Sequence, residues 1–362
     1  MTKRSATAYA IVLLVLLVCG MIAVVAFAFS EIDRLIEAIV GLLVAFVFAP
    51  VYHELGHVAL ALGADMQVVY VKCFCFRYVK KGGRGKLRFC SPFAPDETQV
   101  VPKKTGSMKK RALWYTLGGL LLEGAFFLVL AIAAAVTAFV GAPDFKLFAM
   151  LPYAAYLFFL NVAPFEYPSG KTDALIARGI IRGEPAETVM LAVMEAHGAL
   201  FEGKSFGELD AETLFSLPQL AEDEPLFAAT LDLKYRYALE NEDYELAQDC
   251  LKRLAASEDY LSDEGYFSLR VELVYFSLLC AKVEPLKKLQ ETDEAFLRSE
   301  DYKAKRILAL YSTLAGKEEE GELLIGQAKK LLEKEPILGV KKFEEKLLER
   351  IKTDEKDDSK RV

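Results

Sequence analysis

The sequence predicts an α-helical integral membrane protein with about four transmembrane helices and a small β-hairpin at the membrane surface, followed by a soluble all-α domain of helical repeats. Apolar residues make up 53% of the 362-residue chain, and several apolar runs are long enough to span a bilayer. The second half is instead rich in Leu, Ala, Glu and Lys with helical periodicity. We therefore expect a membrane-embedded core at 1–180, a helical-repeat domain at 181–352 and a disordered tail at 353–362.

The charge and cysteine patterns bear on two classes of protein, nucleic-acid-binding proteins and disulfide-stabilised proteins. The formal net charge is -7 at pH 7; basic residues gather in the loops of the first third, and the second half is acidic. This pattern gives no support to a nucleic-acid-binding role. The six cysteines follow no regular spacing, so we expect no disulfide framework.

The first apolar run is Ala6–Ser30, and Lys3 and Arg4 precede it. Its Ala26–Ala28 segment is similar to a signal-peptide cleavage site. The apolar core is longer than that of a typical signal peptide, which favours a retained transmembrane helix. A short, mostly acidic linker at Glu31–Glu37 is expected to lead into the next apolar run.

The second apolar run, Ala38–Ala64, carries the motif HELGH at residues 53–57. Positions i and i+4 of a helix lie on one face, so the imidazoles of His53 and His57 can reach one metal ion. Glu54, the one Asp, Glu, Lys or Arg of this run, can serve as general base toward an attacking water. The pattern H-E-x-x-H on a helix is typical of zinc hydrolases. The alternative is an accidental match on a buried helix, but ionisable residues within a membrane helix are costly and usually functional.

These residues resemble the site-2 protease family of intramembrane zinc metalloproteases, whose motif is H-E-x-x-H within a membrane helix. The resemblance covers roughly Leu35–Asp173. It implies a zinc cofactor bound by His53 and His57, and peptide-bond hydrolysis with Glu54 as the catalytic base.

The loop Asp65–Arg111 is basic, with twelve Lys and Arg against three Asp and Glu. The positive-inside rule places this loop in the cytoplasm, together with both ends of the chain. Within the loop, Met66–Val79 and Leu87–Phe93 flank a glycine-rich turn, which predicts a β-hairpin at the membrane surface. An edge of this hairpin could hold a substrate in extended form, or the hairpin could be a plain interfacial element.

The third apolar run, Ala112–Val140, contains Gly118, Gly119 and Glu123. Paired glycines allow close contact between helices. The site-2 protease family often has an Asn where this chain has Glu123, and the resemblance would give that position a polar contact with the substrate. The carboxyl of Glu123 could instead be protonated, support a metal ligand by hydrogen bonding, or pair with a basic residue at the membrane edge.

The fourth apolar run, Phe145–Val162, leads directly into Asn161 and Pro164. The site-2 protease family places an Asn here, a Pro three residues later, and then an Asp that is the third zinc ligand. Asn161 and Pro164 match this pattern, and Asp173 occupies the place of that Asp in relatives with a longer spacer.

A catalytic zinc site needs a third protein ligand besides the two histidines. Asp173 and Glu166 are the acidic candidates at the membrane edge, with Glu123 ranked behind them, and we prefer Asp173. The residue that follows it is Ala174, where the family has a Gly.

In the second half, Tyr237–Ala247 and Leu308–Leu331 each read as helix, short polar turn, helix. They are similar to tetratricopeptide-type helix pairs, with an irregular helical bundle as the alternative. His197, the one histidine outside the motif, is interpreted as an ordinary structural residue.

Together these patterns predict a zinc-dependent endopeptidase, multi-pass in the cell membrane, that cleaves membrane-spanning or membrane-anchored polypeptides. Its expected partners are the lipid bilayer, the substrate polypeptide and a protein that could dock on the helical-repeat domain. Two alternatives remain: a catalytically silent membrane scaffold that acts through its helical repeats, and a membrane-anchored zinc protease that acts on soluble peptides.

Overall fold

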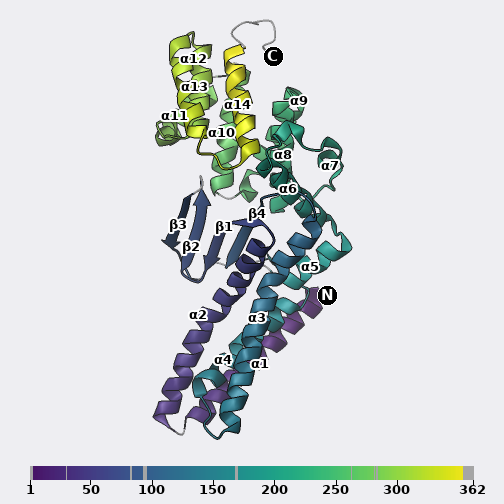
Figure 1. Ribbon diagram of the computed structural model, residues 1–362, viewed down its shortest axis with the longest axis vertical. Helices are drawn as coiled ribbons and strands as arrows, with labels where there is room; N and C mark the ends of the chain where they lie inside the picture. The colour runs from purple at the N-terminus through teal and green to yellow at the C-terminus, as the bar shows by residue number, and fades with distance from the viewer. Residues whose placement is uncertain are drawn as a thin grey trace. The chain divides into compact units, whose positions relative to one another are not determined.

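The computed structural model describes residues 3–29, 31–81, 84–92, 96–167, 170–261, 263–280, 282 and 284–353. It is mostly helical, with four long apolar helices, a small antiparallel sheet and a further set of shorter helices (Figure 1). The tail predicted at 353–362 lies outside the described residues apart from its first residue.

Four helices are apolar and long enough to cross a bilayer: α1 Lys3–Ala28, α2 Ile32–Gly63, α3 Met108–Phe139 and α4 Phe145–Val162. Large apolar side chains such as Leu16, Leu43 and Leu128 are exposed on their outer faces. The four helices coincide with the four apolar runs of the sequence. The linker expected at Glu31–Glu37 is wrong, because α2 already begins at Ile32, where Ile32, Leu35 and Ile36 continue the helical spacing of apolar residues.

Helices α2 and α3 touch backbone to backbone. A Cβ atom at Gly56 would lie 2.1 Å from the carbonyl oxygen of Gly118, and a Cβ at Gly118 would lie 2.4 Å from that of Gly56. Non-bonded atoms cannot approach so closely, so glycine at both positions is a condition of this contact. Helix α2 continues through Pro50, so that proline does not end it.

The sheet has four antiparallel strands in the order β3-β2-β1-β4. They are β1 Met66–Cys73, β2 Phe76–Lys81, β3 Arg84–Phe89 and β4 Glu97–Pro102. The predicted two-stranded hairpin is therefore too simple. The first expected strand breaks at Phe74, whose φ of 50° belongs to a tight turn, and β4 was not expected. Strand β4 pairs with β1 on one side and forms an edge of the sheet among the described residues.

A short connection follows α4 and leads back toward α2. It contains the two-residue strands β5 Glu166–Tyr167 and β6 Gly170–Lys171, and helix α5 Asp173–Arg182 follows. Thr172 caps α5: its side chain accepts a hydrogen bond from the backbone N–H of Leu175. The same hydroxyl donates to the carbonyl oxygen of Ala163 at 2.8 Å, so the two ends of the connection are tied together.

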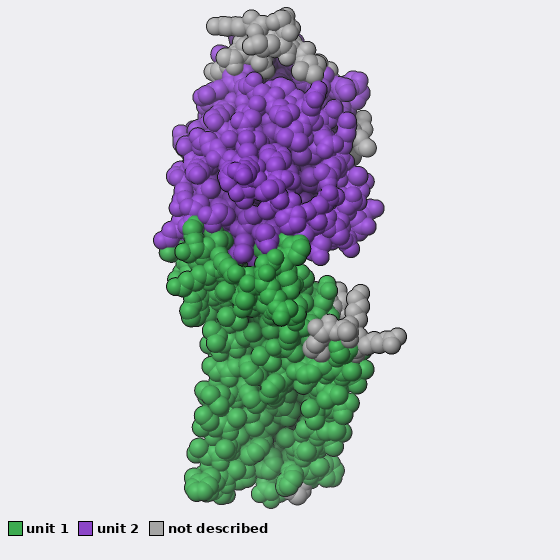
Figure 2. Space-filling view, turned by 90° about the vertical axis from the view of Figure 1, so that its right-hand side faces the viewer, with its two compact units in different colours: residues 1–102, 106–187 green, residues 103–105, 188–362 purple. Residues whose placement is uncertain are grey.

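The remaining elements are helical: α6 Pro185–Phe201, η1 Phe206–Glu208, α7 Ala211–Ser216, α8 Pro225–Glu240, α9 Tyr244–Ala256, η2 Glu258–Tyr260, α10 Asp263–Leu279, α11 Glu284–Leu297, α12 Tyr302–Leu314, α13 Glu318–Leu332 and α14 Leu338–Thr353. The two predicted helix–turn–helix segments are present as α8–α9 and α12–α13. The chain divides into two compact units, Met1–Pro102 with Gly106–Glu187, and Lys103–Thr105 with Thr188–Val362 (Figure 2).

Buried charges connect three helices of the second unit. The guanidinium of Arg306 on α12 lies 2.9 Å from Glu272 of α10 and 2.8 Å from Glu344 of α14, and all three side chains are almost fully buried. Burial raises the pKa of Glu272, but the positive charges of Arg306 and its neighbours outweigh burial and hold that pKa well below its ordinary value. Glu272 is therefore ionised at neutral pH. Removing Arg306 would leave uncompensated negative charge in the core of this unit, so we expect its loss to be strongly destabilising.

Candidate metal centre

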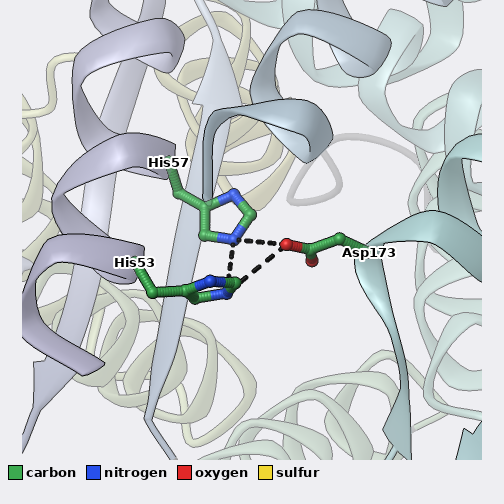
Figure 3. A group of neighbouring side chains, drawn as sticks. All are labelled: His53, His57 and Asp173. Atoms are coloured by element: carbon green, nitrogen blue, oxygen red, sulfur yellow. Dashed lines mark hydrogen bonds and ion pairs between the residues drawn. The ribbon is translucent and has the colours of Figure 1, made fainter. Parts of the chain in front are cut away.

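Three side chains from two elements converge at one point. His53 and His57 project from one face of α2, and Asp173 projects from the first turn of α5 (Figure 3). The Nε2 atoms of the two histidines are 3.2 Å apart. The Oδ2 atom of Asp173 lies 3.4 Å from Nε2 of His53 and 3.3 Å from Nε2 of His57. Among the described residues, these three form the one group of His, Cys, Asp and Glu side chains close enough to share a metal ion.

Hydrogen bonds on the far sides of the rings show which nitrogens face this point as acceptors. Nδ1 of His57 lies 2.9 Å from the carbonyl oxygen of Tyr115, and a carbonyl only accepts, so Nδ1 carries the proton. Nδ1 of His53 lies 3.1 Å from Oε2 of Glu123, and it donates to that group when Glu123 is ionised. Neutral imidazoles with the proton on Nδ1 would present both Nε2 lone pairs to each other and to Asp173.

If both imidazoles are neutral, the three facing atoms are all acceptors, and a shared cation would stabilise their close approach. Oδ2 of Asp173 is buried and makes no hydrogen bond, as expected of an oxygen kept for a metal ion. Two imidazole nitrogens and one carboxylate oxygen also match the ligand set of catalytic zinc sites. The residues present therefore fit a metal ion.

Gly119 of α3 leaves room beside the two rings. A Cβ atom at this position would lie 2.5 Å from Nε2 of His57 and 2.8 Å from Nε2 of His53. Gly119 thus differs from Gly118, because it faces the rings of His53 and His57 and Gly118 faces the backbone of Gly56.

We expect Gly119→Ala to weaken metal binding by about ten- to a hundredfold, the usual effect of disturbing the surroundings of a ligand. Alanine favours helices, so the fold should persist, and circular dichroism would check it. Gly63→Ala on α2 is the matched control, since a Cβ there meets nothing within 4 Å. Unchanged metal affinity of Gly119→Ala in equilibrium dialysis would contradict this geometry.

Glu54 lies beside the cluster and is held by the sheet. Its side chain is 5% exposed, and its Oε2 atom accepts a hydrogen bond of 2.5 Å from the hydroxyl of Thr98 on β4. The phenol of Tyr115 donates to the carbonyl oxygen of Thr98. The backbone carbonyl of Tyr115 also contacts Nδ1 of His57. Strand β4 is therefore connected to Glu54 directly through Thr98 and to His57 through Tyr115.

Glu123 and Asn161 lie behind His53. Glu123 is fully buried, and its Oε2 also accepts from Nδ2 of Asn161 at 3.3 Å. Among the described residues no basic side chain other than His53 pairs with Glu123, so the membrane-edge ion pair is not formed. Of the roles considered for Glu123, hydrogen bonding to a metal ligand is the one that this geometry matches.

Two other predicted residues, Pro164 and Glu166, are not part of the His53, His57 and Asp173 group. Pro164 follows the end of α4 and is half-buried, and Glu166 is exposed; neither belongs to the metal-binding group. Sequence reasoning did not single out Thr98, Tyr115 or Thr172. Of these only Thr172 left a signal, because a Thr followed directly by a helical stretch is typical of an N-cap.

The chain was compared with protein-family models, curated proteins and solved structures. No protein-family model matches this chain, and neither a curated protein nor a solved structure matches it.

Proposed function

We propose that this chain is a zinc-dependent intramembrane endopeptidase of the site-2 protease type. The observation that carries the proposal is the buried cluster of His53, His57 and Asp173 on a 32-residue apolar helix and the helix that follows α4. These three side chains would hold the zinc ion. A bound zinc ion supplies Lewis acidity, which polarises a peptide carbonyl and makes water a nucleophile near neutral pH.

Glu54 is the proposed acid–base residue. It is next to His53 in the chain and is buried, so its carboxylate can take a proton from the attacking water and pass it to the leaving amine. In the described conformation Thr98 occupies its Oε2 atom. The second carboxylate oxygen, Oε1, can still accept the proton of the attacking water while Thr98 holds Oε2.

Strand β4 is the proposed guide for the substrate. It is an edge strand, and Thr98 places it in contact with Glu54. A polypeptide unwound from a membrane helix can pair its backbone with such an edge, which would bring an extended segment to the metal centre. The helical unit would select that substrate or dock a protein partner through tetratricopeptide-like helix pairs such as α8–α9.

The membrane topology follows from the charges of the loops. We propose that α1–α4 span the cell membrane, with both termini and the helical unit in the cytoplasm and the sheet at the cytoplasmic surface of the membrane. Cysteine labelling tests this. Cys250 is buried and unsuitable, so the sites are Cys90 and, in the helical unit, Leu323→Cys.

In intact cells a membrane-impermeant reagent should leave both cysteines unmodified and should modify them after the membrane is opened. Pro143→Cys, exposed in the connection between α3 and α4, is the positive control and should react in intact cells. Labelling of Cys90 in intact cells would show that the orientation is reversed.

Peptidase activity is tested with the purified full chain in a bilayer. We expect cleavage of a membrane-embedded reporter polypeptide, loss of cleavage with a chelator, and recovery when zinc is added back. Failure to bind zinc would instead favour a silent scaffold. Preferential cleavage of a soluble peptide of the same sequence would favour a membrane-anchored protease of soluble substrates.

A further inference from the structure

The outer strands of the sheet, β2 and β3, have one apolar face. Residues directly opposite in an antiparallel pair point to the same side, and here Phe76 pairs with Phe89 and Tyr78 with Leu87. The two phenylalanine rings contact each other, with centroids 5.3 Å apart. Phe76, Leu87 and Phe89 are nevertheless 41%, 67% and 82% exposed. These neighbouring side chains, which we call the apolar face of the hairpin, are unfavourable in water.

The opposite side of the same strands is basic. Arg77 lies directly across from Arg88, and Lys86 follows at the next position on that side, opposite Val79. Like charges placed directly across a strand pair destabilise it. Among the described residues no carboxylate forms an ion pair with Arg77, Lys86 or Arg88, and Nε of Arg77 is buried without a hydrogen-bond partner. We call these three residues the basic face. Lys86 and Arg88 are exposed and can contact an anion from outside the chain.

The position of the sheet shows where both faces would find their partner. The turn between β1 and β2 lies against α2, since the ring of Phe74 contacts Phe46 at a centroid distance of 6.2 Å. Phe46 is seven residues before His53, or about 10 Å along the helix axis. The sheet therefore lies beside the C-terminal part of α2 with its β1–β2 turn against that helix, and β3 is an edge strand (Figure 1).

We infer that the β2–β3 hairpin binds acidic phospholipids of the surrounding bilayer. Its apolar face enters the boundary between acyl chains and water, and its basic face lies within the reach of the anionic headgroups, about 8 Å at physiological salt. A soluble anion would leave the apolar face unexplained, whereas an acidic lipid matches both faces. The inference rests on the membrane insertion proposed above and is independent of peptidase activity.

Tryptophan fluorescence provides the test, because Trp114 is the sole tryptophan of the chain. Two single-tryptophan reporters are made in a Trp114→Phe background: Phe89→Trp on the apolar face, and Leu128→Trp on the exposed side of α3. The full chain is reconstituted in phosphatidylcholine bilayers that contain, at equal mole fraction, acyl-brominated phosphatidylcholine or acyl-brominated phosphatidylglycerol. Bromine quenches tryptophan on contact, so quenching reports which lipid is adjacent.

We expect both lipids to quench the Leu128→Trp reporter equally, and phosphatidylglycerol to quench the Phe89→Trp reporter more strongly. Each basic residue near an anionic leaflet contributes about fivefold to the local preference. Arg77→Gln with Arg88→Gln should therefore lower the phosphatidylglycerol preference by about five- to twenty-five-fold. Arg298→Gln with Lys317→Gln, both in the helical unit and equal in charge change, should leave it unchanged.

Three results would overturn the inference. Quenching of the Leu128→Trp reporter alone would show that the hairpin does not touch lipid and would favour a protein partner on the apolar face. Equal quenching of the Phe89→Trp reporter by the two lipids, or a preference that survives the double Arg→Gln change, would remove the role of acidic headgroups. Absence of quenching at both positions would reject membrane insertion itself, and with it the proposed function.

Discussion

Replacing Asp173 with alanine is expected to abolish activity by removing the metal ion. Two histidines one helical turn apart cannot complete a catalytic zinc site, and Asp173 is the carboxylate that lies within 3.4 Å of both. The loss of a direct ligand should exceed the ten- to hundredfold loss typical of a residue that only supports a ligand. Metal content of the purified variants, measured by mass spectrometry, checks this.

Two further variants are compared with Asp173→Ala for their metal content. Glu166→Ala should keep its metal, because Glu166 is exposed and outside the cluster. Glu123→Ala should fall between the two, since Glu123 reaches the site only through His53. If Asp173→Ala retained full zinc while Glu123→Ala lost it, the ligand assignment would be wrong.

Glu54→Gln should separate acid–base chemistry from metal binding. Glutamine has nearly the same shape and can still accept a hydrogen bond from Thr98, but it cannot accept the proton of the attacking water. The rate should fall by about a hundred- to ten-thousand-fold, the usual contribution of a positioned general base. Single-turnover cleavage of the membrane-embedded reporter measures it, with zinc content as the control for an intact site.

The zinc content of Glu54→Gln should equal that of the unaltered chain, because His53, His57 and Asp173 remain. Thr98→Val is a useful companion. It removes the hydroxyl that holds Glu54 but leaves the acid in place, so its rate should fall far less. Substantial activity of Glu54→Gln would assign the proton transfer to another group.

The sequence predicted what depends on local pattern. The four apolar helices follow from uninterrupted apolar runs, and His53 and His57 share a face because of helical spacing alone. The expected return of the chain after α4 also brings Asp173 to the cluster. Tertiary contacts were beyond reach: Thr98 meets Glu54 across 44 positions, and Glu123 meets His53 across 70.

The sheet illustrates the same limit. Met66–Val79 alternates well enough to predict a strand, but nothing in that alternation marks the turn at Phe74. Strand β4 is six residues long and forms through pairing with β1, so its existence depends on a neighbour supplied by the fold. The sequence left several roles open for Glu123, and its contact with His53 in the structure was needed to choose hydrogen bonding to a candidate metal ligand.

The contact between Gly56 and Gly118 limits how this protein can be engineered. Exchanging a helical glycine for alanine commonly raises the free energy of unfolding by about 0.5–1 kcal/mol. Here either exchange would drive a methyl group into a backbone carbonyl, and relief would require the two helices to separate. Separation of the helices would break the hydrogen bond between His57 and the carbonyl oxygen of Tyr115. The gain in helix propensity would therefore come with a distorted metal centre. A search for more thermostable variants should therefore leave Gly56, the motif residue before His57, unchanged. It should begin at glycines with open surroundings, such as Gly63 and Gly326.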